Sequence, residues 1–302
     1  MSLYRDIRSI LLSSIDEGEA SAITLMLMEK IAGIDRLHAL MGDDSTKRDE
    51  LLNAAKRIAK GEPVQYVIGE AEFCGLHFVV KPDVLIPRPE TEELVNHLMA
   101  DVKGERGKVK AEGLKILDIG TGSGCIAVSL AKRLGEFEVS KVQEFKGSKP
   151  KVTVEAWDVS NEALLIAKEN AERNGVDVKF EKVDVLEEKV KGEREKVKDK
   201  FDIIVSNPPY ICNKEAVEME KNVLDHEPHL ALFVPDDDPL LFYRRIAELG
   251  KSLLNSNGKL YFEINRSYGK DVVSLLTSFG YENVNLYQDQ FGNDRIVNAI
   301  KP

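Results

Sequence analysis

An alternation of short apolar runs with helical patterns, from about residue 113 to residue 300, is the feature that most constrains the fold of this chain. Helical patterns such as those at 125–134 and 163–174 separate the early runs, which indicates βαβ units and a mainly parallel sheet. The last two runs have no helix-length gap between them, so we expect an antiparallel hairpin at the sheet edge. The predicted strands are 114–119, 152–156, 178–180, 201–206, 259–264, 284–287 and 295–300.

Residues 1–62 differ from the rest because they show only helical patterns. Apolar residues between Leu51 and Ile58 repeat at helical spacing, with charged residues left for solvent. Gly61 followed by Pro63 is a typical helix stop. We therefore expect a small helical bundle that serves recognition or packing rather than chemistry.

Short extended runs separated by Gly and Pro over residues 64–90 predict a β-hairpin linker. We expect Thr91 to cap the helix that follows. Two polar segments, 135–151 and 187–200, look inserted, and we interpret them as solvated loops, with an interaction tail as the alternative for the second. The predicted domains are a helical substrate-recognition domain at 1–70, the hairpin linker at 71–92 and a catalytic domain at 93–302.

Composition limits the function. The chain has 302 residues with 42 Lys and Arg against 52 Asp and Glu, a formal net charge of −10. Affinity for phosphate backbones comes mainly from Lys and Arg, so this balance argues against stable binding to nucleic acid. The three cysteines are far apart, which suits neither a disulfide framework nor a zinc site. Charges near the N-terminus argue against a signal peptide, and no apolar stretch reaches the roughly 18 residues that span a membrane, so we expect a cytoplasmic protein.

A glycine-rich turn follows the strand 114–119 and opens a helix. Glycine lets the backbone approach a ligand closely, and a helix N-terminus offers unpaired N–H groups. The spacing is G-x-G-x-G rather than the G-x-G-x-x-G of a dinucleotide fold, and an acid before the turn suits a cationic ligand group better than a pyrophosphate. A simple tight turn is the alternative. The candidate cofactor-binding residues here are Asp118, Gly120, Thr121, Gly122, Ser123 and Gly124.

Two further strands end in acids. Asp158 closes the second strand, where a carboxylate can bind both hydroxyls of a ribose. Its separation from the glycines exceeds the usual 20 or so residues, and the polar segment 135–151 accounts for the excess. Asp184 and Val185 follow the third strand and could meet the amino group and the ring of an adenine. Taken alone, either acid could be a solvated strand end.

The segment Asn207-Pro208-Pro209-Tyr210, directly after the apolar strand 201–206, is the sharpest signal in the chain. Two prolines fix φ and remove two N–H donors, which leaves carbonyl groups as acceptors. Asn207 adds a side-chain carbonyl, and Tyr210 offers a flat face. Together they could hold the NH₂ group of an amide or an aminopurine, although a proline-rich turn is the alternative.

Because ligands bind at the carboxyl ends of parallel strands, the four candidate groups should converge on one crevice. A nucleoside with a cationic end, next to a clamp for an NH₂ group, describes S-adenosylmethionine and an amide or amine acceptor.

The combination of Asn-Pro-Pro-Tyr with Asp-x-Gly-x-Gly-x-Gly resembles the S-adenosylmethionine-dependent amino methyltransferases. Together with the helical N-terminal region, it resembles more closely the peptide chain release factor glutamine methyltransferases, the HemK/PrmC family. The resemblance covers nearly the whole chain. The other segments that fit this family are 85–92, 226–232, 242–246 and 292–295.

The resemblance implies an α/β fold: a seven-stranded Rossmann-like methyltransferase sheet with a reversed last hairpin, preceded by a small helical bundle. It implies methylation of the glutamine side chain in the Gly-Gly-Gln motif of bacterial class I release factors. By position, the glycine turn would hold the methionine end of the cofactor, Asp158 the ribose, and Asp184 and Val185 the adenine. Asn207 to Tyr210 would hold the glutamine amide, with Asn207 also next to the cofactor.

This chain departs from the family pattern in two ways. It carries the two polar segments, and it has Phe262-Glu263-Ile264-Asn265 where the family usually has Glu-Ile-Gly. We expect both departures to lie outside the clamp.

No His or Lys belongs to the four motifs, so we expect positioning rather than a strong base. The Asn207 side-chain oxygen and the Pro208 carbonyl would accept the two amide hydrogens and aim the nitrogen at the methyl group.

The rival functions are a DNA adenine N6-methyltransferase acting on a flipped base and a non-catalytic S-adenosylmethionine-binding module. The acidic charge disfavours the first, and the intact clamp disfavours the second. The glycine spacing makes a dehydrogenase the weakest interpretation. We expect a monomer.

Overall fold

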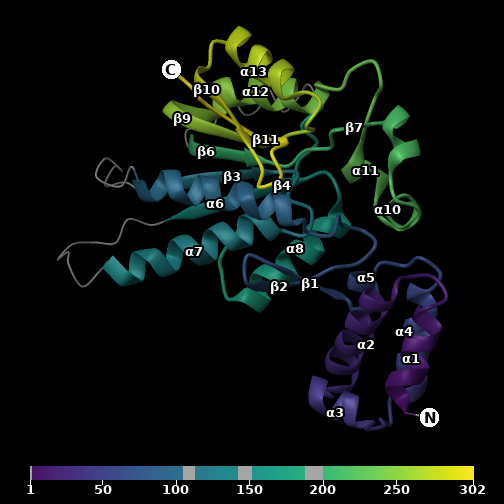
Figure 1. The fold of residues 1–302 in the computed structure, drawn as a ribbon. Coiled ribbons are helices and arrows are strands. Elements are labelled where there is room, and N and C mark those ends of the chain that lie inside the picture. The colour runs from purple at the N-terminus through teal and green to yellow at the C-terminus, as the bar shows by residue number, and fades with distance from the viewer. Residues whose placement is uncertain (1, 105–112, 142–151, 188–199) are drawn as a thin grey trace. The chain divides into compact units, whose positions relative to one another are not determined.

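The computed structural model describes residues 2–104, 113–141, 152–187 and 200–302. Contacts between these residues divide the chain into two compact units (Figure 1). The first unit comprises Met1–Glu70, Val80–Pro82 and Met219–Glu227, and the second comprises Ala71–Val79, Asp83–Glu218 and Pro228–Pro302. The domain boundaries taken from the sequence stay a prediction.

The first unit is helical. Its core consists of apolar side chains from α1 to α4, among them the fully buried Leu3, Leu27 and Leu51. The helical prediction for residues 1–62 is confirmed. Residues 64–68, expected as part of an extended linker, form another short helix after Pro63, whose fixed φ of −56° suits a helix start. The helices are α1 (Leu3–Leu11), α2 (Glu17–Ala32), α3 (Arg36–Met41), α4 (Arg48–Ile58), α5 (Val64–Ile68) and α10 (Lys221–His226).

The predicted hairpin is present as β1 (Glu70–Phe73) and β2 (Leu76–Val79). Both turn residues, Cys74 and Gly75, have positive φ (53° and 75°), which matches the twist of a tight hairpin. Helix α6 (Pro89–Gly104) begins two residues before Thr91, so the prediction that Thr91 caps it is wrong. Pro89 takes the first helical position, where its missing N–H costs nothing, and the Thr91 hydroxyl serves other contacts.

The second unit is built on a seven-stranded sheet with the order β10-β11-β9-β6-β3-β4-β5. Strands β3, β4, β5, β6 and β9 pair in parallel, and β11 runs antiparallel to both β9 and β10. The predicted α/β fold with a reversed last hairpin is confirmed. The strands are β3 (Lys115–Ile119), β4 (Thr153–Asp158), β5 (Lys179–Lys182), β6 (Phe201–Ser206), β9 (Leu254–Glu263), β10 (Glu282–Gln288) and β11 (Asp294–Ile300).

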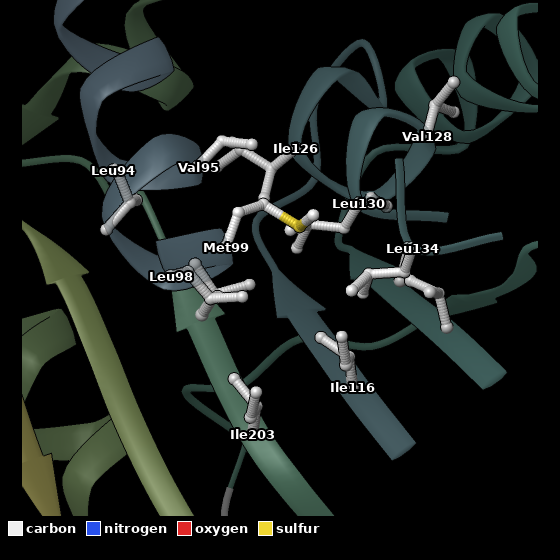
Figure 2. Close-up of a cluster of buried hydrophobic side chains, with 14 of the residues drawn as sticks. Leu94, Val95, Leu98, Met99, Ile116, Ile126, Val128, Leu130, Leu134 and Ile203 are labelled. Atoms are coloured by element: carbon white, nitrogen blue, oxygen red, sulfur yellow. The ribbon is translucent and has the colours of Figure 1, made fainter. Parts of the chain in front are cut away.

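Two apolar cores cover the two faces of this sheet, because successive side chains of a strand point to opposite faces. Ile116 and Ile203 belong to one core, whereas the next residues, Leu117 and Ile204, belong to the other. Figure 2 shows side chains of α6 and α7 gathered over Ile116 of β3 and Ile203 of β6. The first core is covered by α6, α7 (Cys125–Lys141) and α8 (Asn161–Asn174), and the second by α12 (Leu241–Leu253) and α13 (Gly269–Ser278).

Shorter elements follow β6: β7 (Ile211–Cys212), η1 (Asn213–Glu218), α11 (His229–Leu232) and β8 (Phe233–Val234). Helix α7 runs to Lys141, so the expected loop 135–151 is helical in its first part. A single glycine such as Gly135 costs a helix only about 1 kcal/mol and does not end it. Residues 142–151 and most of the predicted loop 187–200 lie outside the described residues. None of the described helices is long and apolar enough to cross a membrane.

Candidate functional site

The four groups of candidate residues lie at the carboxyl ends of adjacent parallel strands. Asp118 is near the end of β3, Asp158 ends β4, and Asp184 follows β5. Asn207 follows β6, which is the neighbour of β3 on its other side. The sheet therefore brings all four groups to one edge, which is where open α/β sheets bind ligands.

Hydrogen bonds tie the glycine turn to the two acids beside it. Thr121 Oγ1 donates to Asp118 Oδ2 at 2.6 Å, and the Gly122 N–H donates to Asp158 Oδ2 at 2.8 Å. The Gly120 N–H also donates to the carbonyl oxygen of Trp157, at 2.9 Å. Asp118 and Asp158 are therefore structural parts of the same turn, as well as candidate ligand groups.

Gly120, Gly122 and Gly124 have φ of +74°, +54° and +81°, a conformation that favours glycine. Behind them, Asn170 of α8 is fully buried, and its Nδ2 donates to the Ser123 carbonyl at 2.9 Å. The same side chain exchanges two hydrogen bonds with the backbone of β2. Asn170 was missed at the sequence level, although an Asn on the apolar face of a helical pattern is a signal that could have found it.

Asp118 is the most unusual charge of the site. It is fully buried, and its Oδ1 has no hydrogen-bond partner among the described residues. Burial raises the pKa of its carboxyl to about 7, against the opposing effect of the Thr121 hydroxyl. A buried carboxylate with one oxygen left without a hydrogen bond is costly, so a cationic ligand group beside it would be stabilised. This chemistry fits the cationic end of S-adenosylmethionine.

The other two acids are held by backbone N–H groups. Asp158 Oδ1 accepts from the Ser160 N–H at 2.9 Å, and burial raises the pKa of this carboxyl while these N–H groups lower it. Asp184 Oδ1 accepts from the Leu186 N–H at 2.9 Å. The Val185 side chain is buried in the second core of the sheet. The roles of these residues toward a nucleoside stay a prediction.

The clamp residues Asn207 and Tyr210 are both connected to one buried carboxylate. Tyr210 Oη donates to Glu263 Oε1 at 3.1 Å. Asn207 Nδ2 donates to Thr91 Oγ1 at 3.1 Å, and Thr91 Oγ1 donates to Glu263 Oε2 at 2.6 Å. Only 1% of Glu263 and 2% of Thr91 are exposed. Pro208 is buried, and Pro209 is half-buried between the two anchored side chains.

Opposing effects act on Glu263. Burial raises its pKa, whereas the Thr91 hydroxyl, the charge of Arg295 and the Tyr210 hydroxyl lower it. Burial and the Glu263 charge also raise the pKa of Tyr210 above its usual range, so this side chain stays a neutral phenol. Both Glu263 oxygens already accept from hydroxyl groups, an arrangement that suits a fixed acceptor better than a catalytic base.

The expectation that the departures from the family pattern lie outside the clamp is wrong for Asn265. Its Nδ2 donates to the Tyr210 carbonyl at 3.1 Å and to Glu215 Oε1 at 3.3 Å. The reason lies in the sheet: β6 and β9 are parallel neighbours, so the residues after both strands emerge side by side. Neighbouring strand ends 55 residues apart in sequence could not be paired before the strand order was known.

Two family models match the chain. A model described as "Methyltransferase domain" matches residues 110–266, and one described as "PrmC N-terminal domain" matches residues 3–69.

Individual relatives cover almost all of the sequence. A Bacteroides thetaiotaomicron protein named release factor glutamine methyltransferase is 46% identical over 285 residues, covering 93% of this chain and 92% of the relative. A Flavobacterium psychrophilum protein of the same name is 43% identical over 293 residues, covering 95% and 94%. A solved structure described as "delta-N METTL16 MTase domain" shares 20% identity with a TM-score of 0.50, over 76% of this chain and 90% of that one, and supports the fold alone.

Proposed function

This chain belongs to the release factor glutamine methyltransferase family, and on that premise we propose that it transfers a methyl group from S-adenosylmethionine to the glutamine side-chain nitrogen in the Gly-Gly-Gln motif of bacterial class I peptide chain release factors. The observation that carries the proposal is the anchored segment Asn207-Pro208-Pro209-Tyr210 at the same sheet edge as the buried carboxylate of Asp118, one oxygen of which has no hydrogen-bond partner among the described residues.

In this proposal, three strand ends hold the cofactor, which supplies a methyl group on a positively charged sulfur. Asp118 and the turn Gly120–Gly124 hold its methionine end, and Asp158 holds the ribose hydroxyls. Asp184 and Val185 lie at the adenine. The buried negative charge of Asp118 suits a cationic group.

The protein's contribution to the reaction is orientation. Asn207 Oδ1 and the Pro208 carbonyl accept the two hydrogens of the substrate amide, which draws electron density onto its nitrogen. The bound cofactor would supply the methyl group: the lone pair would form the new N–C bond while the electrons of the S–C bond stay on sulfur, and the nitrogen would lose one proton to water. Orienting two bound reactants contributes about 7–11 kcal/mol to lowering a barrier. Acceptors aimed at the charge that develops on nitrogen add to this.

We also propose that the protein acts as a monomer in the cytoplasm and does not bind nucleic acid stably. The formal net charge of −10 supports the last point, because binding to phosphate backbones requires clustered cations.

The test is to incubate the protein with cofactor labelled in its methyl group and a release factor, and to locate the label by peptide mass spectrometry. We expect it on the side chain of the Gly-Gly-Gln glutamine. A parallel reaction on double-stranded DNA tests the rival adenine methyltransferase. Label on adenine, or none on the glutamine, would contradict the proposal.

A further inference from the structure

The Asn207 side chain has two chemically different ends, and only one suits the proposed reaction. Its carbonyl oxygen accepts hydrogen bonds, whereas its NH₂ group donates them. An Asn207 amide turned by 180° would present hydrogens to the hydrogens of the substrate amide, and the clamp would fail. The protein therefore needs a group that selects one orientation.

Thr91 has the geometry to make this selection. Its Oγ1 lies 2.6 Å from Glu263 Oε2 and 3.1 Å from Asn207 Nδ2. A hydroxyl has a single proton, and 2.6 Å is typical of a hydroxyl that donates to a carboxylate. Once that proton is committed to Glu263, Thr91 can only accept from Asn207. The NH₂ end must then face Thr91, so that the carbonyl oxygen is directed elsewhere.

Glu263 is in turn held in place. It ends strand β9, it is almost fully buried, and its second oxygen accepts from the Tyr210 hydroxyl at 3.1 Å. Its burial raises its pKa, and the two hydroxyl donors and the positive charge of Arg295 act in the opposite direction. One carboxylate thus fixes Tyr210 directly and Asn207 through Thr91.

We propose that Thr91, fixed by Glu263, is a positioning residue that aims the Asn207 carbonyl oxygen at the substrate amide. This inference rests on the function proposed above. Thr91 touches neither reactant in this scheme and acts only through Asn207.

The test compares Thr91→Val, which keeps the shape but removes the hydroxyl, with Thr91→Ser, which keeps the hydroxyl. We expect Thr91→Val to lower kcat for release factor methylation about tenfold, the effect of one lost hydrogen bond. The KM for the cofactor should stay within about twofold. Thr91→Ser should restore kcat to within about threefold of the original protein, because its hydroxyl can make the same two bonds.

Thr24→Val is the matched control. Thr24 is also fully buried, and its hydroxyl donates to the Ala20 carbonyl at 2.7 Å within α2 of the first unit. This variant loses a buried hydroxyl in the unit that does not contain the clamp, and we expect its kcat to be unchanged.

The outcomes separate the two proposals. If the unaltered protein leaves the glutamine unlabelled, the proposed function fails. If it labels the glutamine but Thr91→Val keeps the full kcat, the positioning role is excluded. A loss that Thr91→Ser does not restore, or that falls equally on cofactor binding, would show that Thr91 contributes only packing and would also overturn the inference.

Glu263→Gln gives a second measurement. A glutamine side chain has one acceptor oxygen in place of two, so it cannot accept from Thr91 and Tyr210 in the same way. We expect kcat to fall, and the double variant with Thr91→Val to lose less than the product of the two single effects, because both changes break one chain of hydrogen bonds. Fully multiplicative effects would contradict that chain.

Discussion

At the scale of single residues, the clamp depends on hydroxyl and carboxylate groups that have no place in its motif. Asn207 and Tyr210 are both tied to Glu263, which is contributed by a different strand. The main chain of Tyr210 is tied to Asn265, which follows the same strand. The short motif thus supplies the proposed contacts to the substrate, while residues far along the chain hold its side chains and main chain in place.

Asn207→Ala removes the side-chain acceptor itself. We expect turnover to fall about a hundredfold or more, the usual effect of losing one preorganised polar group, while cofactor affinity stays within about tenfold. Single-turnover methylation and calorimetric cofactor binding would measure the two effects. Asn53→Ala, at an exposed position of α4, is the control. A variant at Asn207 with turnover near that of the original protein would remove this residue from the mechanism.

Asp118 predicts a pH dependence of cofactor binding. Burial raises the pKa of its carboxyl to about 7, and a cationic ligand binds the ionised form more tightly than the protonated form. Affinity should therefore be greatest above pH 7 and decrease as the pH falls from 7 to 5.5, by up to about tenfold per unit.

The variant Asp118→Asn has no charge to titrate. It should bind the cofactor weakly at pH 8, and its affinity should change less between pH 8 and 5.5 than that of the original protein. Titration calorimetry at several pH values measures both. An Asp118→Asn variant that keeps the full pH dependence would assign the effect to another group, such as Asp158.

Sequence patterns could find the candidate residues for ligand contact but not the residues that hold those candidates in place. Asn207 and Tyr210 stand out because the two prolines between them are rare after an apolar strand. Thr91 and Glu263 are 172 positions apart, and no local pattern links them. A Thr near a helix start most often caps it, so the local rule favoured the wrong role for Thr91.

At the scale of elements, the glycine turn is constrained both by its backbone conformation and by its packing against α8. A Cβ on Gly124 would lie 3.0 Å from Ala167 Cβ and 3.2 Å from Ala167 Cα on α8. A Cβ on Gly122 would meet nothing within 4 Å. The start of helix α7 therefore packs closely against α8 at Gly124. The sequence predicts the alternation of strands and helices, but it does not predict this contact, which depends on tertiary packing.

The two glycines give a matched pair of variants. Both have positive φ, and an alanine in this left-handed conformation is strained. Each change to alanine should therefore lower the free energy of unfolding by about 1–2 kcal/mol. Gly124→Ala should lower the free energy of unfolding by about 1–3 kcal/mol more, because its methyl group overpacks the contact with α8. Urea unfolding without cofactor would measure the difference. Equal destabilisation by the two variants would show that the α7–α8 contact can adjust to the extra methyl group without a loss of stability.

At the scale of the whole molecule, the chain builds separate cores. One lies within the helical unit and two cover the sheet of the other unit. The division into a helical and an α/β part could be predicted, since the periodicity of apolar residues changes along the sequence. The later segment Met219–Glu227, which contains α10, belongs to the helical unit, and no local signal indicated this.

Leu27→Ala tests whether the two units serve separate tasks. Leu27 is fully buried in the helical core, so its truncation should lower the free energy of unfolding of that unit by about 2–5 kcal/mol. We expect a higher KM for the release factor and an unchanged affinity for the cofactor. Leu12→Ala, at a leucine that is 41% exposed, should change neither. A parallel loss of cofactor affinity in Leu27→Ala would contradict the separation.

The membership of Met219–Glu227 in the helical unit has a consequence for synthesis on the ribosome. Although the helices α1 to α5 emerge first, their unit gains its last segment only after more than 200 residues have been translated, including the sheet strands β3 to β6. The two units therefore cannot mature strictly one after the other, as independent domains do during translation. The nascent helical unit has to wait, incomplete, for a segment that arrives from within the second half of the chain.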